Sequence, residues 1–338
     1  MTKRINIALQ GGGAHGAFTW GVLDRLLEDD QIEIAGISGT SAGALNGAAL
    51  KAGLLSGGKD GARENLDWLW GRIGSLGDLR LSGWMAGMGP SAGAISQALE
   101  YSLPFNMADA ASRVFSPYLY GPLYRNPLEK IASRFRYDAV CADDGPALFV
   151  CATNVETGKV KVFSGHDITT KSILASACLP TLFQAVEIDG APYWDGGYTG
   201  NPALFPLFDK DLPSDIVVVN INPLVRPGTP KEPREILNRI NEISFNSSLL
   251  RELRAIHFAQ RLLADGNVSE GALKRVLVHM IADDTLMTDL GVASKMLPTP
   301  GIIFELRDAG RAAADTFLSQ HRDKIGVASS VDLTEMYD

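Results

Sequence analysis

Short continuous apolar runs alternate with helically spaced apolar positions along the first part of the chain. Residues 4–10 and 32–38 are apolar runs of strand length, which is typical of buried strands. Residues 17–28 carry apolar positions at four-residue intervals, and residues 42–54 are rich in alanine, so both segments are predicted to be helices. A chain that opens β-α-β-α favours a parallel sheet covered by helices.

The rest of the chain continues with further strands and helices. Strands are expected at 147–152, 159–164, 216–222 and 275–281, and a short hairpin around Asp189-Gly190 is expected at 186–193. A long amphipathic helix is expected at about 232–264, and a closing helix near 304–321. The proline-rich segment PLVRPGTPKEP separates the long helix from the strand before it, which predicts a linker.

The composition is that of an ordinary soluble protein. The 338 residues are 46% hydrophobic and 21% charged, and the net charge of −8 comes without a long basic run. This disfavours nucleic-acid binding and simple electrostatic adsorption to anionic lipid. No apolar stretch reaches the roughly 18 residues of a membrane span. Three scattered cysteines without a C-x-x-C pair fit a reducing compartment, so a cytoplasmic location is expected.

The first strand leads into a glycine-rich loop with the spacing Gly11-x-Gly13-x-x-Gly16. This is the spacing of a dinucleotide-binding turn, which also needs an acidic residue about 20 residues on, at the end of the second strand. The second strand ends instead in GISGTSAG, without a carboxylate, and no Gly-Lys-Ser/Thr follows the loop to make a Walker motif. Binding of NAD or FAD is therefore disfavoured, and no cofactor is expected.

The second strand ends in Gly39-Thr40-Ser41-Ala42-Gly43, a G-x-S-x-G sequence between a strand and a helix. That position is typical of a nucleophile elbow, in which a sharp turn holds a serine at the carboxyl edge of the sheet, beside a helix N-terminus. Because both glycine-rich turns follow parallel strands, they are expected to lie together at this edge. Backbone N–H donors to an oxyanion are then expected from Gly11, Gly12, Gly13 and Ala42.

The serine needs a base, and Asp195 in YWDGGYTGNP is the strongest candidate. It ends a short strand and precedes two glycines, which indicates a tight turn at a sheet edge. An α/β-hydrolase triad would need a histidine in a loop after a strand, with an acid partner, and none is evident. The downstream histidines are His166, His257, His279 and His321. A triad remains the alternative to a Ser-Asp dyad. No cluster of His, Asp and Glu has metal-ligand spacing, so no metal is expected.

Three motifs, in this order, resemble those of the patatin-like phospholipase family. They are Gly11-Gly12-Gly13-Ala14-His15-Gly16, Gly39-Thr40-Ser41-Ala42-Gly43 and Asp195-Gly196-Gly197, and residues 175–197 resemble the segment that leads to the family's catalytic aspartate. The resemblance covers about residues 5–209. It implies a three-layer α/β/α fold with a mostly parallel central sheet. The expected organisation is a catalytic domain over 4–222, with a mainly helical C-terminal extension over 223–338 packed on the same domain.

The resemblance also implies a function and a set of site residues. Ser41 would be the nucleophile and Asp195 the base of a lipid acyl hydrolase, of phospholipase, lysophospholipase or carboxylesterase type, that works through an acyl-Ser41 intermediate without a metal. The supporting motif positions are His15, Gly16, Gly39, Gly43, Gly196 and Gly197. The family usually carries Arg or Lys where this chain has His15, so a fixed positive charge beside the oxyanion is missing.

The expected partner is a lipid or other acyl ester, with peripheral contact to a membrane or lipid aggregate. Residues 83–96, which contain Trp84, Met85 and Met88, form either a lid over such a site or a loop packed on the core. A catalytically silent lipid-binding or regulatory relative is the alternative function, and the intact Ser41 and Asp195 argue against it. The oligomeric state is left open by the sequence.

Overall fold

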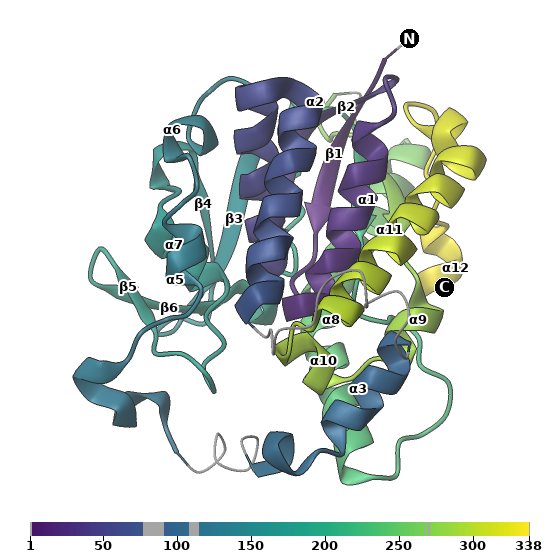
Figure 1. The fold of residues 1–338 in the computed structure, drawn as a ribbon. Coiled ribbons are helices and arrows are strands. Elements are labelled where there is room, and N and C mark those ends of the chain that lie inside the picture. Colours follow the sequence, from purple (N-terminus) through teal and green to yellow (C-terminus); the bar gives the residue numbers. More distant parts are fainter. Residues whose placement is uncertain (1, 77–90, 108–114, 267, 270, 338) are drawn as a thin grey trace.

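The apolar runs of the sequence form the strands of one central sheet (Figure 1). The computed structural model describes residues 2–76, 91–107, 115–266, 268–269 and 271–337. The strands within these residues are β1 (Lys3–Leu9), β2 (Ile32–Thr40), β3 (Ala147–Asn154), β4 (Val160–Ser164), β5 (Val186–Ile188), β6 (Ala191–Asp195), β7 (Asp215–Val219) and β8 (Leu277–Ile281). The main path across the sheet runs β5-β6-β3-β2-β1-β7-β8, and β4 pairs with β3.

The pairing is parallel through most of the sheet. Neighbouring strands in the order β3-β2-β1-β7-β8 are parallel, whereas β4, β5 and β6 pair antiparallel. The predicted mostly parallel sheet is thus confirmed. Between β5 and β6, Asp189 and Gly190 have φ angles of 51° and 79°, as a two-residue hairpin turn with two left-handed positions requires.

Helices connect the strands and cover the sheet. The longer and shorter α-helices are α1 (Gly16–Leu27), α2 (Ala42–Leu76), α3 (Ala92–Glu100), α5 (Glu129–Ala132), α6 (Tyr137–Val140), α7 (Thr170–Ser176), α8 (Pro233–Ala264), α9 (Asp284–Thr288), α10 (Val292–Met296), α11 (Pro300–His321) and α12 (Leu333–Tyr337). Short 3-10 helices are η1 (Gly13–His15), η3 (Pro117–Leu123), η4 (Gly165–Asp167), η5 (Gly196–Tyr198), η6 (Phe205–Phe208) and η7 (Arg322–Lys324).

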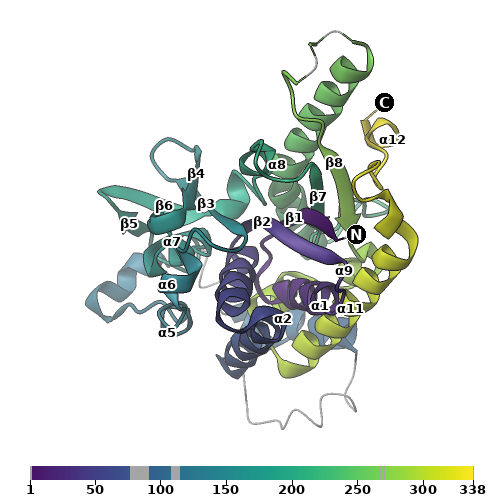
Figure 2. The same cartoon turned by 90° about the horizontal axis from the view of Figure 1, so that it is seen from above.

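The sheet lies between two layers of helices. Figure 2 shows α1, α2 and α11 on one face of the sheet and α8 on the other. Along β7, Val217 and Val219 belong to the core under the first group, whereas Ile216 and Val218 belong to the core under α8. This division follows from the alternation of side chains along a strand. The three-layer α/β/α architecture predicted for the chain is confirmed.

Some elements differ from their predicted bounds. Helix α2, expected to end near residue 54, continues to Leu76 after an interruption at Gly57 and Gly58, where the backbone angles are not helical. The residues after 223 add β8 to the sheet beside β7 and pack α11 against α1. Residues 77–90, including Trp84, Met85 and Met88 of the expected lid, lie outside the described residues. In the part of the chain that is described, no helix is long and apolar enough to cross a membrane.

Two glycines allow α1 and α11 to pack backbone against backbone. A Cβ atom on Gly21 of α1 would lie 1.9 Å from the backbone oxygen of Arg307, and one on Gly310 of α11 would lie 2.0 Å from that of Phe18. Neither position leaves room for a methyl group unless the helices separate. This contact holds α11 against the first βαβ unit, and it depends on the absence of two side chains.

Replacement of Gly310 by alanine is therefore expected to destabilise the fold, although alanine is the better helix former. Forcing a methyl group into a closely packed contact costs roughly 1–3 kcal/mol. The matched control is Gly71→Ala in α2, where a Cβ atom would meet nothing within 4 Å. That change is expected to stabilise the protein by up to about 1 kcal/mol through helix propensity. Urea denaturation of both variants measures the difference, and equal effects would contradict the proposed backbone contact.

Candidate active site

Backbone pairing brings the ends of β2 and β6 side by side. Cys151 of β3 pairs with Thr40, the last residue of β2, and the next residue, Ala152, pairs with Asp195, the last residue of β6. Ala152 also pairs with β4. Since a strand has only two edges, β6 continues along the edge of β3 that β2 leaves. Ser41 follows Thr40 directly, so the register sets Ser41 beside Asp195.

Ser41 occupies a strained turn between β2 and α2. Its φ angle is 55°, a left-handed conformation that is uncommon for a residue with a side chain and costs of order 1–3 kcal/mol. Its N–H donates to Ser176 Oγ at 2.8 Å, and Ser176 Oγ donates to the Cys151 oxygen at 2.6 Å. These bonds tie the turn to α7 and β3. The geometry is that expected of a nucleophile elbow.

Close backbone contacts account for the glycines on either side of Ser41. A Cβ atom on Gly39 would lie 2.5 Å from the oxygen of Gly43, and one on Gly43 would lie 2.1 Å from the oxygen of Leu9. A Cβ atom on Gly16 would lie 2.6 Å from that of Ala42. The G-x-S-x-G turn thus packs against the end of β1, and the loop after β1 packs against the start of α2.

Asp195 is a buried carboxyl with one oxygen held by the backbone. Asp195 Oδ1 accepts a hydrogen bond from Gly197 N–H at 2.7 Å, whereas Oδ2 is buried and has no partner of normal geometry in the described structure. Burial raises the pKa of Asp195 to about 7, against the lowering effects of the Gly197 N–H and of the neighbouring Ser41 hydroxyl. The carboxyl therefore exchanges its proton near neutral pH.

The two glycines after Asp195 also meet close neighbours. A Cβ atom on Gly196 would lie 2.3 Å from the oxygen of Cys151, and one on Gly197 would lie 2.5 Å from Phe245 Cε1. Phe245 belongs to α8, so this helix packs against the turn that carries Asp195. Larger residues at either position would displace the carboxyl from Ser41.

The glycine-rich loop after β1 lies against Ser41, but its first N–H is already bonded. A Cβ atom on Gly11 would lie 2.7 Å from Ser41 Cβ. Gly11 N–H donates to Asn201 Oδ1 at 2.6 Å, so it is not available to an oxyanion, which removes Gly11 from the donors expected from the sequence. Gly13 and Ala42 begin helices and have no acceptor within them. Gly12, the N-cap of η1, comes just before Gly13.

The same loop is braced by amide side chains that sequence reasoning did not identify. Gln10 Oε1 accepts from the backbone N–H groups of Ile221 and Asn222 at 2.9 and 3.1 Å, and Asn222 Nδ2 donates to the Gly11 oxygen at 2.9 Å. Asn201 donates from Nδ2 to the oxygen of Phe245 at 3.1 Å. Asn222 was expected to end a strand and Asn201 precedes a proline, and neither position signals such a contact.

His15 is enclosed by the protein. It is only 1% exposed, and its Nε2 lies 2.8 Å from Ser294 Oγ of the C-terminal extension. Burial and, to a smaller degree, the charge of Lys295 lower the pKa of His15 well below its ordinary value. His15 is therefore not a solvated residue at the start of a helix. Its imidazole is neutral at physiological pH and supplies no fixed positive charge.

His279 has an acid partner, away from Ser41. His279 of β8 lies with Nε2 3.0 Å from Asp215 Oδ1 and Nδ1 3.1 Å from Ser330 Oγ. No sequence motif marks these three residues. Its distance from Ser41 is roughly 20 Å, from the strand registers and the usual strand spacing. Among the described residues, no three His, Cys, Asp or Glu side chains gather closely enough to hold a metal ion.

Comparison with known proteins finds a family that includes the motifs around Ser41 and Asp195. A family model described as patatin-like phospholipase matches residues 7–208. Among solved structures, the crystal structure of VipD from Legionella pneumophila aligns with a TM-score of 0.46 and 15% sequence identity, over 98% of this chain and 72% of VipD. A search of curated proteins finds no match.

The family match covers more than half of the 338 residues and includes all three motifs that carried the resemblance. It ends just before β7, so that β7, β8 and the helices from α8 onward lie outside it. The chain therefore belongs to the patatin-like phospholipase family.

Proposed function

We propose that this protein is a lipid acyl hydrolase that cleaves carboxylic esters through an acyl-Ser41 intermediate. The observation that carries the proposal is the register of β2, β3 and β6, which sets Ser41 beside the buried carboxyl of Asp195. The family match supports hydrolysis of lipid esters at the level of the family. The dyad, its donors and the lipid surface described next are parts of the same proposal.

In the first step, Ser41 Oγ attacks the ester carbonyl carbon while its proton passes to Asp195. The C–O bond to the alcohol then breaks, and the alcohol leaves with the proton from Asp195. In the second step, water attacks the acyl-Ser41 ester and gives a proton to Asp195. The bond between the acyl carbon and Ser41 Oγ then breaks, Asp195 returns the proton to Oγ, and the fatty acid leaves. A base with a pKa of about 7 suits this exchange near neutral pH.

The negative oxygen formed in both steps needs hydrogen-bond donors close to Ser41. We assign this role to the N–H groups of Gly12, Gly13 and Ala42, with Gly11 serving as the close-packed residue behind the serine. Loss of one such donor typically costs about 2.7–4 kcal/mol of transition-state stabilisation. The N-terminus of α2 adds a partial positive charge at the same place.

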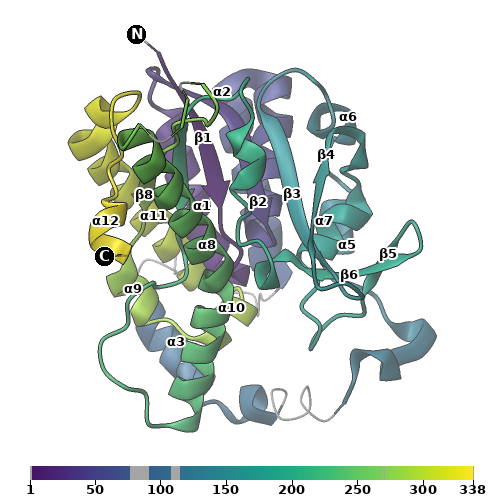
Figure 3. The ribbon, with the colours of Figure 1, turned by 180° about the vertical axis from the view of Figure 1, so that it is seen from behind.

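Exposed apolar side chains support a lipid substrate. Ile236, Ile240 and Ile243 form an exposed stripe on the first half of α8, which extends below the carboxyl edge of the sheet beside α3 (Figure 3). Leu103 and Met107, just after α3, are exposed as well. We propose that acyl chains of a membrane or lipid aggregate meet the protein here. A cytoplasmic location, inferred from the scattered cysteines, belongs to the same proposal.

Ser41→Ala is expected to reduce ester hydrolysis to the background rate, a loss on the order of 10⁴-fold or more. The assay is a panel of phospholipids, lysophospholipids and simple acyl esters. A fluorophosphonate probe is expected to label Ser41 in the wild type, with the modified peptide identified by mass spectrometry. A catalytically silent relative would hydrolyse none of the panel.

The control for this experiment is Ser330→Ala, because Ser330 contacts His279, which in turn contacts Asp215. Ser330 and His279 lie far from the glycine-rich loop, so Ser330→Ala and His279→Ala are expected to keep wild-type activity per folded molecule. Substantial activity in Ser41→Ala, together with loss in Ser330→Ala, would replace the dyad by a triad at that second position.

Asp195→Asn is expected to abolish hydrolysis and yet stabilise the protein at alkaline pH. The folded carboxyl has a pKa of about 7 and the unfolded one about 3.9. Between these values the folded state binds more protons, so the wild type loses stability as pH rises from 4 to 7. Asparagine does not titrate and keeps an oxygen for Gly197 N–H. The gain should approach at most about 4 kcal/mol above pH 7 and vanish near pH 4.

Urea denaturation of the wild type and Asp195→Asn at pH 4, 6 and 8 measures this gain. Asp189→Asn is the matched control, because Asp189 is exposed at the β5–β6 turn and asparagine tolerates its positive φ. It is expected to change stability little at any pH. Equal stability of Asp195→Asn and the wild type at pH 8 would contradict the burial of an ionised carboxyl.

A further inference from the structure

Helix α10 packs directly against the glycine-rich loop, although it lies outside the segment that matches the family. A Cβ atom on Gly13 would lie 2.3 Å from the backbone oxygen of Lys295. The preceding residue, Ser294, contacts His15. Gly13 also has a φ of 59°, so a side chain there would be both strained and blocked. The C-terminal extension therefore forms one wall of the candidate oxyanion site.

A chain of hydrogen bonds connects the Lys295 side chain to the backbone of this loop. Lys295 Nζ donates to Asn222 Oδ1 at 2.8 Å, and Asn222 Nδ2 donates to the Gly11 oxygen at 2.9 Å. The Gly11 carbonyl and the Gly12 N–H belong to the same peptide unit. Because resonance couples the two ends of a peptide, a donor on the carbonyl makes the N–H more positive, and linked hydrogen bonds polarise one another.

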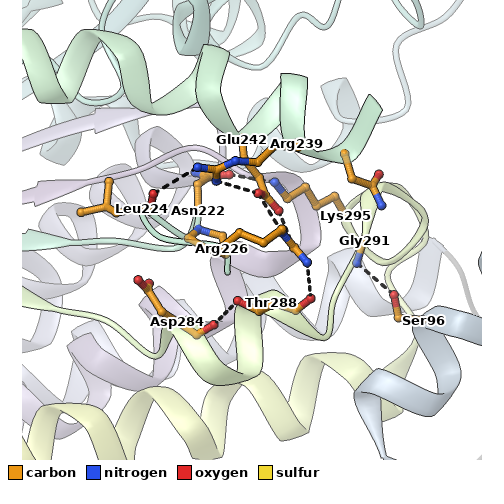
Figure 4. A network of polar contacts seen from close by, with 12 residues as sticks. Ser96, Asn222, Leu224, Arg226, Arg239, Glu242, Asp284, Thr288, Gly291 and Lys295 are labelled. Carbon is orange, nitrogen blue, oxygen red and sulfur yellow. Dashed lines mark hydrogen bonds and ion pairs between the residues drawn. The ribbon is translucent and has the colours of Figure 1, made fainter. Parts of the chain in front are cut away.

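The charged groups around Lys295 leave its positive charge without a direct counterion. Figure 4 shows Glu242 bound by Arg226 and Arg239, at distances of 2.6 and 3.1 Å. Among the residues described, no carboxylate lies within ion-pair distance of Lys295 itself, whose ammonium group bonds to Asn222. On the side of the loop, His15 is neutral. The ammonium group is thus the positive charge that the hydrogen-bond chain joins to the loop.

We propose that Lys295 is a polarising residue for the ester hydrolysis proposed above, on which this inference rests. Its ammonium group acts through Asn222 and the Gly11–Gly12 peptide to strengthen the Gly12 N–H as a donor to the oxyanion. Lys295 thereby supplies, from α10, the positive charge that His15 does not supply from within the loop. It touches neither the ester nor the reacting atoms, so its role is to prepare the donor.

Deprotonation of Lys295 would switch this effect off. Removal from water lowers the pKa of Lys295 to about 8, with Glu242 raising it and Arg226 lowering it further. Arg226 and Arg239 are the other cations on this side, and both bind Glu242. Activity should therefore rise with pH as Asp195 loses its proton near pH 7, and fall again as Lys295 loses its proton near pH 8.

Two ionisable neighbours of Asp195 do not titrate in this range. Burial raises the pKa of Tyr198 and that of Cys178 to about 12 in each case. On the opposite side, the pKa of His15 is far below 6.5. An alkaline decline near pH 8 can accordingly be assigned to Lys295 by mutation.

The experiment compares Lys295→Met with Lys295→Arg. Lys295→Met is expected to lower kcat roughly tenfold with little change in KM, since it weakens one oxyanion donor without removing it. Lys295→Arg is expected to restore kcat to within about threefold of the wild type and to abolish the alkaline decline, because arginine keeps its charge. The measurement is kcat and KM from pH 5.5 to 10, with thermal melting of each variant.

Two further variants separate polarisation from packing. Lys274→Met is the matched control, because Lys274 is another half-buried lysine that donates to the backbone oxygens of Leu207, Asp209 and Leu212. It is expected to affect melting but not kcat. Asn222→Leu breaks the chain between Lys295 and Gly11, so its loss of kcat is expected to be non-additive with that of Lys295→Met.

The outcomes distinguish this inference from the proposed function. A folded Lys295→Met with wild-type kcat and an unchanged alkaline decline would overturn the role of Lys295, while labelling of Ser41 by the fluorophosphonate would leave the hydrolase proposal standing. A parallel loss of kcat in Lys274→Met, or no rescue by Lys295→Arg, would reduce Lys295 to a packing residue. A wild type that neither hydrolyses esters nor reacts with the probe would overturn both proposals.

Discussion

The arrangement of the site depends on one exchange of partners along the edge of β3. Strand β2 leaves this edge at Cys151, and β6 takes its place from Ala152 onward. Two backbone segments that are distant in the sequence therefore end at adjacent positions, one with Ser41 and the other with Asp195. Gly39, Gly43 and Gly196 lie where these turns meet, and each has a backbone carbonyl as its nearest neighbour. A single added methyl group at Gly39, Gly43 or Gly196 would meet a carbonyl oxygen within 2.5 Å.

Burial of the Asp195 carboxyl at this junction has two effects. It lowers the stability of the fold when the carboxyl is ionised, and it raises the pKa of the carboxyl into the range where a base works near neutral pH. Asp195 is satisfied on one oxygen and left without a full partner on the other, and its raised pKa measures how poorly the site solvates negative charge. The fold tolerates such a group because the carboxyl can take up a proton instead of staying charged. The nearby amides of Gln10, Asn201 and Asn222 are also buried, and each bonds across the ends of strands.

The fold and the outline of the site could be predicted because their signals are local. Apolar runs and helical spacing predict the mostly parallel sheet, and the short motifs around Ser41 and Asp195 predict the tight turns that the structure has. The contacts of Gly11 could not be predicted, because its N–H meets Asn201, 190 residues away, and nothing near Asn201 marks it for that bond. The burial of His15 was likewise hidden, since the group that covers it, Ser294, is 279 residues away. A single amide or lysine side chain produces no periodic pattern in the sequence, so its role appears only in the tertiary structure.

The position of the positive charge near the loop has a physical reason. A cation placed at residue 15 would lie at the N-terminus of α1, where the helix dipole opposes it, and inside a region where His15 is 1% exposed. Lys295 instead approaches from α10, is half-buried, and stands one amide away from the loop. Its longer side chain keeps the ammonium group bonded to a neutral oxygen, while Glu242, saturated by two arginines, lowers the cost of burying the charge without neutralising it directly. The C-terminal extension is then more than a cover on the sheet, because the electrostatics of the loop after β1 are incomplete without it.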